Sequence, residues 1–227
     1  MITVTENFRK IQDLLAMATA DATRPAGSVQ LLAVSKSQPA ARIREAAEFG
    51  QRHFGENFVQ EALAKKEQVG RDDLVWHFIG RLQTNKTRMV AEHFDWVHTV
   101  DRLKTARRLS EQRPYYAGNL NICIQVNIDG EPGKSGVPPD ELTTLADAIC
   151  GLARLRLRGL MCIPAVHHGI EAQRDPFQKL RQLSEALAEA GIVTDTLSMG
   201  MSADFEAAIL EGATIVRIGT ALFGERQ

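Results

Sequence analysis

The sequence of this 227-residue chain predicts an α/β fold, namely a single-domain (β/α)8 TIM-type barrel with an additional N-terminal helix. Two observations support this prediction. Short apolar stretches of strand length alternate with segments of helical periodicity, and eight such strands follow one another without a linker or a change in composition. Eight strands alternating with helices in a chain of this length are typical of a closed barrel, and an open doubly wound sheet is the alternative. We therefore expect residues 1–227 to form one domain.

The individual elements follow from this alternation. The chain opens with a helical segment at 5–20, where Phe8, Ile11, Leu14 and Leu15 are spaced for one buried face. Strands are predicted at 29–34, 52–55, 74–79, 96–100, 120–126, 157–163, 195–199 and 214–218. Helices between them are predicted at 39–49, 58–69, 84–93, 102–111, 139–152, 176–190 and 202–212.

Residues that favour helix ends support several of these boundaries. Proline suits a first helical turn, a short polar side chain suits an N-cap, and glycine suits the position after the last turn. The candidates are Pro39 and Pro139 for first turns, Asp101 and Ser202 for N-caps, and Gly50, Gly191 and Gly212 for C-terminal ends.

The composition argues against several classes of function. A net charge of -1 gives no broad electrostatic attraction to nucleic acid or to an anionic membrane. No apolar stretch approaches the roughly 20 residues that span a bilayer, and the N-terminus lacks the apolar core of a signal peptide. Three widely spaced cysteines, Cys123, Cys150 and Cys162, indicate free thiols, with Cys123 and Cys162 in predicted strands. We therefore expect a cytoplasmic protein without disulfides.

Lys36 is the first candidate functional residue. It follows the apolar run 31–34 and stands at the carboxyl end of the first predicted strand, where α/β folds build their sites. A partly dehydrated lysine loses its charge more easily, and a neutral amine forms an imine with an aldehyde. The alternative is a strand-end lysine whose stem packs on apolar surface while its amine reaches water.

The last two strand ends form a candidate phosphate site. The segments 198–202 and 217–224 place small residues before two predicted helices, where backbone N–H groups favour an anion. Ser202 and Thr220 add hydroxyl donors, and barrels commonly bind phosphate between the loops after strands seven and eight. Ordinary capping and tight turns are the alternative explanation.

A phosphate site and an imine-forming lysine on one rim indicate pyridoxal 5'-phosphate (PLP) as the cofactor. Arg217 precedes the glycine of the second turn by two residues, so its side chain can point inward below the cofactor ring. An arginine only donates hydrogen bonds, and it therefore disfavours protonation of a pyridine nitrogen and weakens the ring as an electron sink. A surface ion pair is the alternative role for Arg217, although Val216 and Ile218 on either side argue for burial.

The chain resembles the pyridoxal-phosphate homeostasis protein family, single-domain relatives of the alanine racemase barrel. The motifs that carry the resemblance run through the whole chain, at 33–36 (AVSK), 53–57 (HFGEN), 76–86 (WHFIGRLQTNK), 159–164 (GLMCIP), 197–202 (LSMGMS) and 217–224 (RIGTALFG). The resemblance implies a PLP-binding barrel with a role in PLP homeostasis and no established catalysis. It implies these contacts: Lys36 at the imine, Asn57 near the ring, Arg217 at the pyridine nitrogen, and Ser202, Gly219 and Thr220 at the phosphate.

A carrier fits the sequence better than a racemase, which needs a proton acceptor on each face of the substrate carbon. The second base of alanine racemase is a tyrosine from an added domain, for which no residues remain here. Tyr115 and Tyr116, the two tyrosines of the chain, precede the fifth strand and are expected at the opposite, amino-end face. We therefore assign no catalytic residue. The alternative is a small PLP-dependent amino-acid racemase with His77 as the second base, although an inward His77 is more often a packing residue. A barrel that binds sugar phosphates without PLP is a third possibility.

The remaining features carry less weight. Lys134, in a glycine-rich loop after the fifth strand, is either a second amine that takes PLP transiently or a solvated loop lysine. The run Lys65-Lys66 is interpreted as a solvated helix face, and the histidines show no metal-ligand spacing, so no metal is assigned. The expected partners are PLP and apo PLP-dependent enzymes, and the family resemblance favours a monomer.

Overall fold

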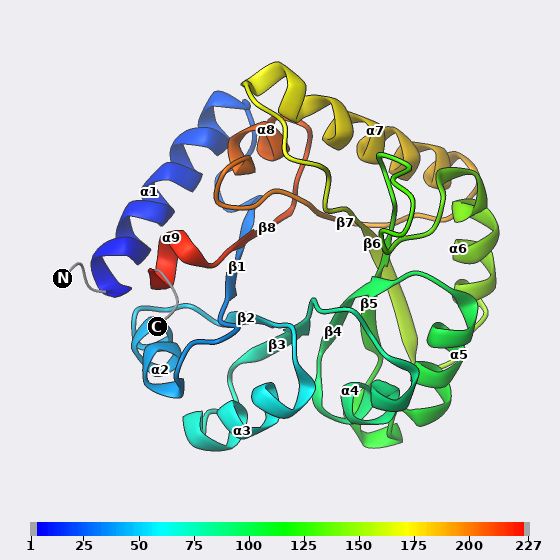
Figure 1. Ribbon diagram of the computed structural model, residues 1–227, viewed down its shortest axis with the longest axis horizontal. Helices are drawn as coiled ribbons and strands as arrows, with labels where there is room; N and C mark the ends of the chain where they lie inside the picture. Colours follow the sequence, from blue (N-terminus) through cyan, green and yellow to red (C-terminus); the bar gives the residue numbers. More distant parts are fainter. Residues whose placement is uncertain (1–3, 225–227) are drawn as a thin grey trace.

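Eight parallel strands close into a barrel in chain order in the computed structural model, which describes residues 4–224 (Figure 1). The strands are β1 (Gln30–Val34), β2 (His53–Glu56), β3 (Val75–Phe78), β4 (Trp96–Val100), β5 (Leu120–Gln125), β6 (Leu155–Met161), β7 (Thr196–Ser198) and β8 (Ile215–Ile218). β1 pairs with both β2 and β8, and this pairing closes the sheet. The predicted (β/α)8 barrel is confirmed, and the open sheet is wrong.

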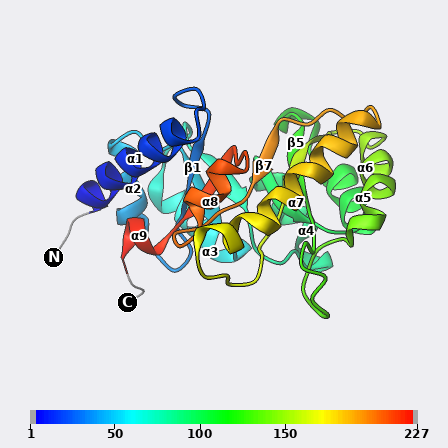
Figure 2. The ribbon, with the colours of Figure 1, turned by 90° about the horizontal axis from the view of Figure 1, so that it is seen from above.

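Helices surround the barrel, as the periodicity predicts. They are α1 (Val4–Asp21), α2 (Ala40–Glu48), α3 (Val59–Val69), α4 (Thr87–His93), α5 (Leu103–Gln112), α6 (Leu142–Cys150), α7 (Ile170–Glu189), α8 (Phe205–Leu210) and α9 (Thr220–Phe223), with short 3-10 turns η1 (Thr84–Lys86), η2 (Tyr115–Ala117) and η3 (Pro139–Glu141). The additional helix α1 lies beside α8 and α9 at one edge of the barrel (Figure 2). It buries Phe8, Ile11 and Leu15 of the predicted apolar face, whereas Leu14 is half-buried at its edge.

The buried apolar side chains form two clusters, a small one inside the barrel and a large one that includes the layer between strands and helices. The smaller cluster contains Leu32, Trp96, Cys123, Met161 and Ile215, all from strands. Since side chains alternate across a strand, residues two positions away from these also face inward. This alternation directs Arg217, two residues after Ile215 and paired in register with Leu32, into the barrel at its carboxyl end.

Several predicted boundaries are corrected by the structure. The sixth strand is β6 at Leu155–Met161 and not 157–163, so Cys162 lies just beyond it. α7 begins at Ile170 and contains Pro176, although proline usually marks a helix start. The N-caps of α5 and α8 are Arg102 and Asp204, so the predicted caps Asp101 and Ser202 are wrong.

Other predictions of helix ends hold. Pro39 immediately precedes α2, and Pro139 begins the turn η3 that leads into α6. The glycines predicted at helix ends adopt left-handed φ values, at Gly50 (99°), Gly191 (85°) and Gly212 (95°). A side chain at these positions strains the backbone, which explains why glycine marks the ends correctly.

Gly159 in β6 lies too close to β7 for a side chain. A Cβ atom there would lie 1.8 Å from the carbonyl oxygen of Thr196, and this partner is backbone that cannot move independently. We expect Gly159→Ala to lower the free energy of unfolding by at least about 3 kcal/mol, because overpacking against fixed backbone displaces a barrel strand. Urea titration measures the loss. Gly151→Ala is the matched control, because a Cβ there would lie 3.8 Å from the Ala148 carbonyl oxygen, at ordinary contact distance.

Candidate functional site

A cavity of about 320 Å³ opens at the carboxyl end of the barrel between the loops that follow β1, β2, β7 and β8. All six residues predicted to bind the cofactor line it, namely Lys36, Asn57, Ser202, Arg217, Gly219 and Thr220. Apolar side chains of Val34, Ile79 and Ile163 complete its wall. The structure thus brings together residues that lie up to 184 positions apart in the chain (220 − 36).

Lys36 is partly buried and lies in the turn that follows β1. The residue before it belongs to a buried network, and the exposed residue after it is held by a hydrogen bond from its backbone. The Ser35 hydroxyl donates to Oε1 of Glu56 (2.7 Å), and the Ser35 carbonyl accepts from Nζ of Lys65 (2.6 Å). The backbone N–H of Ser37 donates to Oε1 of Glu61 (2.6 Å). The backbone that carries Lys36 is therefore held at two points.

Lys65 joins these contacts into one cluster. Its ammonium lies 2.8 Å from Glu56 and 2.5 Å from Glu61, and its side chain is only 8% exposed. The interpretation of Lys65-Lys66 as a solvated helix face is therefore wrong. The neighbouring Lys66 is also packed, because its ammonium lies near the rings of Trp76 and Phe94 and burial lowers its pKa.

Glu56 is the acidic centre of this cluster and is fully buried. Burial raises the pKa of its carboxyl group, while hydrogen bonds from Lys65 and Ser35 oppose the rise. Its second oxygen, Oε2, has no hydrogen-bond partner within residues 4–224. The ion pair with Lys65 therefore stabilises the charged form of the buried Glu56 side chain next to the Lys36 turn.

Arg217 is buried, with 5% of its surface exposed, and its guanidinium points into the barrel. It donates to the carbonyl and hydroxyl oxygens of Ser198 (2.6 and 3.0 Å) and to the carbonyl oxygen of Cys162 (2.8 Å). No carboxylate pairs with it in the described part of the chain, and burial lowers its pKa. The surface ion pair considered for Arg217 is wrong. A guanidinium has five N–H donors, so donors remain for a ligand in the cavity.

The two loops of the predicted phosphate site line the cavity, but their helices are short. α8 begins at Phe205 and has six residues, and α9 has four. Ser202 therefore lies in a turn ahead of α8, while Gly219 and Thr220 begin α9. A Cβ on Gly219 would come within 3.1 Å of the Val34 carbonyl oxygen, so a small residue lets this loop approach β1. The candidate phosphate site therefore consists of side-chain hydroxyls and closely packed backbone. Helix dipoles contribute little to anion binding there, because both helices are short.

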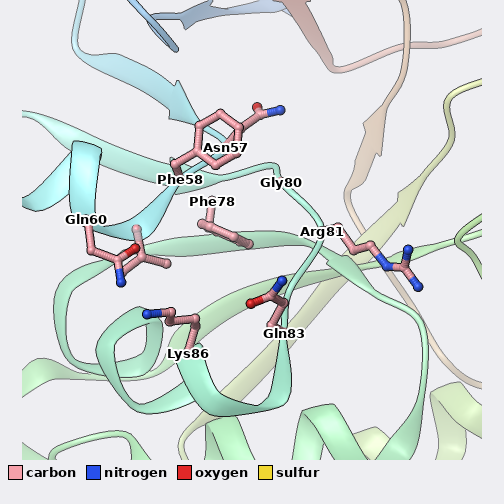
Figure 3. Close-up of a pocket in the computed structure, with 9 residues that line it drawn as sticks. Asn57, Phe58, Gln60, Phe78, Gly80, Arg81, Gln83 and Lys86 are labelled. Carbon is pink, nitrogen blue, oxygen red and sulfur yellow. The ribbon is translucent and has the colours of Figure 1, made fainter.

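Asn57 stands between this cavity and a second one of about 340 Å³. Its Oδ1 atom is buried and has no hydrogen-bond partner among the described residues. Figure 3 shows the second cavity, with Lys86, Gln83 and Arg81 on the loop that follows β3. Gly80 lets the backbone of Asn57 approach closely, because a Cβ at Gly80 would lie 2.1 Å from the Asn57 carbonyl oxygen.

The residues considered for proton transfer lie away from the cavity. His77 is fully buried inside the barrel, hydrogen-bonded to His53 and His98, and does not line the cavity. Tyr115 and Tyr116 are 90% exposed on η2, which precedes β5, and so lie at the amino-end face as predicted. Lys134, the candidate second amine, pairs with Glu131 in the loop after β5 and does not line the cavity.

Several residues of the site were missed by sequence analysis. Ser198 and Cys162 hold Arg217, and Glu56 with Lys65 holds the Lys36 turn. One signal was available for Lys65, since Glu61 precedes it by four residues, the spacing of a helical ion pair. The contact of Lys65 with Glu56 depends on how α3 packs against β2 and has no local signature.

The buried histidines predict a loss of stability in acid. Burial lowers the pKa of His98 to about 3 and lowers that of His77 well below its ordinary value. The unfolded chain takes up these protons as the pH falls below about 6.5. Stability is therefore full above that value and decreases below it, by about 2 kcal/mol for each histidine at about pH 5.

Urea titrations at about pH 7 and pH 5 measure this dependence. The same comparison in His98→Gln, whose side chain does not titrate, should show a pH dependence smaller by about half. Glu56, with its raised pKa, contributes in the opposite direction and is present in both proteins. Equal pH dependences in the two proteins would contradict the prediction.

Comparisons with known proteins agree with this fold and site. The family model described as alanine racemase, N-terminal domain, matches residues 6–227. A Pseudomonas aeruginosa protein named pyridoxal phosphate homeostasis protein is 54% identical over 226 residues, covering 100% of this chain and 97% of that protein. PipY of Synechococcus elongatus, solved with PLP bound, has a TM-score of 0.82 and 41% identity over 92% of this chain and 98% of PipY.

A more distant structure shares the fold alone. Alanine racemase of Clostridium difficile is 16% identical with a TM-score of 0.74, and the match covers 94% of this chain but 56% of the racemase. Within residues 4–224, no helix is long and apolar enough to cross a membrane. The full-length matches at high identity establish the affiliation: the chain belongs to the pyridoxal phosphate homeostasis protein family, whose barrel is that of the alanine racemase N-terminal domain.

Proposed function

We propose that this protein binds PLP through Lys36 and keeps it available inside the cell, as a carrier without catalytic turnover. The observation that supports the proposal best is the single cavity that gathers Lys36, the buried Arg217 and the two polar loops. A relative that is 41% identical has been solved with PLP bound, and a 54% identical relative is named as a PLP homeostasis protein.

The residues of the cavity fit this cofactor group by group. Lys36 would hold the cofactor through an imine between its amine and the cofactor aldehyde, with one water released. Arg217, which has no carboxylate partner in the described chain, supplies N–H donors for the ring nitrogen. Ser202, Gly219 and Thr220 hold the phosphate, and the unpartnered Oδ1 of Asn57 accepts from a ring substituent. When bound, PLP supplies an aldehyde and an electron-withdrawing ring.

The arrangement favours holding PLP over racemisation. Arg217 stays charged and does not protonate a ring nitrogen, which weakens electron withdrawal. Both tyrosines lie at the opposite end of the barrel, and His77 is enclosed within it. Apo PLP-dependent enzymes are the proposed recipients, and the carrier is proposed to act as a cytoplasmic monomer.

Borohydride reduction of the PLP-loaded protein, followed by peptide mapping, tests the binding mode. The expected result is one stable adduct on Lys36 at a stoichiometry near one. An adduct on Lys134 as well would assign the glycine-rich loop a second, transient role, and equal loading and release rates in Lys134→Ala would remove that role. Absence of any reducible adduct would refute the proposal.

Exchange of the α-hydrogen of amino acids with deuterated water separates carrier from racemase. We expect no exchange above that given by free PLP. Exchange at the turnover of ordinary enzymes, about 1 per second or faster, would overturn the carrier assignment.

A further inference from the structure

A line of three histidines runs through the barrel interior and ends at Arg217. Nδ1 of His53 lies 2.9 Å from Nε2 of His77, and Nδ1 of His77 lies 2.8 Å from Nε2 of His98. Nδ1 of His98 lies 2.8 Å from the Ser198 hydroxyl, which also accepts from Arg217 at 3.0 Å. His53 begins β2 and is partly exposed, so the line connects the edge of the barrel with the cofactor cavity.

The donors and acceptors of this line allow one fully satisfied arrangement. Arg217 can only donate, so the Ser198 oxygen is its acceptor. The single hydroxyl hydrogen of Ser198 then goes to its other neighbour, Nδ1 of His98. His98 therefore carries its hydrogen on Nε2 and donates it to Nδ1 of His77. His77 likewise carries its hydrogen on Nε2 and donates it to Nδ1 of His53. All three rings are neutral Nε2–H tautomers in this arrangement.

Burial keeps the line neutral and couples its members. His77 and His98 are fully buried, and the ring of His77 stacks on Trp96 with centroids 5.3 Å apart. Burial lowers the pKa of all three histidines. Because each link holds one hydrogen, no ring can change tautomer without the next one changing too. The histidines lie in a row, and the described chain shows no cluster of metal-binding side chains.

We propose that Ser198 and His98 are positioning residues for Arg217, and that the line His53–His77–His98 transmits the protonation state of His53 to the cofactor cavity. The effect on PLP rests on the function proposed above. The orientation of the hydrogen bonds is a property of the chain itself and is independent of that function.

Protonation of His53 reverses the line. A charged His53 carries hydrogen on Nδ1, which then faces the Nε2–H of His77. The conflict is removed only if every ring shifts its hydrogen to Nδ1. His98 then donates to Ser198, and the Ser198 hydrogen loses its acceptor beside Arg217. The charged and titratable groups that act on the line are Asp95 at His53 and Arg217 at His98.

Nitrogen-15 NMR of the imidazole rings tests the line in protein without cofactor. At neutral pH we expect three neutral Nε2–H tautomers for His53, His77 and His98. Ser198→Ala removes the donor to His98 and is expected to give a mixture of tautomers, whereas Ser198→Thr restores the wild-type pattern. Opposite tautomers within the wild-type line would overturn the proposal.

The absorbance of the PLP-loaded protein supplies the second readout. In Ser198→Ala we expect the adduct on Lys36 to persist while the pH midpoint of the chromophore moves by roughly one unit, because Arg217 loses a fixed partner. In His53→Gln, whose side chain does not titrate, the chromophore should lose the part of its pH response that follows protonation of His53. An unchanged midpoint in both variants would refute the transmission, whereas failure of wild type to form any adduct would refute the proposed function instead.

Discussion

Lys36→Ala is expected to abolish the reducible PLP adduct and its yellow absorbance. Lys36 is the lysine that lines the cavity at the end of β1, and no other amine lines the same cavity in the described chain. In the proposed binding mode, PLP would keep only non-covalent contacts with Arg217, Ser202 and Thr220 in this variant. Spectrophotometric titration with PLP, followed by borohydride reduction, measures the loss.

A matched control separates loss of the amine from loss of a nearby charge. Lys86 lines the adjoining cavity shown in Figure 3. Asn57 lines both that cavity and the one that contains Lys36. Lys86→Ala should form the adduct with wild-type stoichiometry. A wild-type adduct in Lys36→Ala would place the covalent site elsewhere and refute the assignment.

Lys65→Met is expected to destabilise the fold by about 3–5 kcal/mol, because it leaves the buried Glu56 carboxylate without its ion-pair partner. Methionine has a similar length and is apolar, so packing of α3 is largely retained. The loss also frees the Ser35 carbonyl, and PLP loading on Lys36 should become slower. Urea titration and the loading rate are the two measurements.

Two further variants show whether the loss of stability in Lys65→Met comes from the unpaired buried charge. Lys179→Met breaks a helical ion pair with Asp175, in which the two side chains are 53% and 59% exposed. This substitution should lower the free energy of unfolding by less than about 1 kcal/mol. The double variant Glu56→Gln with Lys65→Met removes both charges and should recover part of the loss. If Lys65→Met alone were as stable as wild type, the buried pair would have no structural role.

Local patterns were sufficient for the barrel. Strand and helix periods are properties of neighbouring residues, so β4 was located at its observed bounds and the helix-ending glycines were identified. Errors arose where tertiary packing overrides a local preference. Pro176 lies within α7, and the N-caps Arg102 and Asp204 each stand C-terminal to the predicted residue.

The candidate site divides in the same way. The sequence alone predicted the barrel, and with the family resemblance it also predicted six residues that the structure gathers around one cavity, because parallel strands in chain order bring their carboxyl ends to one rim. Only the tertiary structure decided that Lys65 is buried against Glu56, that Ser198 holds Arg217, and that three histidines align behind it. These contacts join different strands and helices, and the burial that gives them their strength depends on packing across the whole barrel.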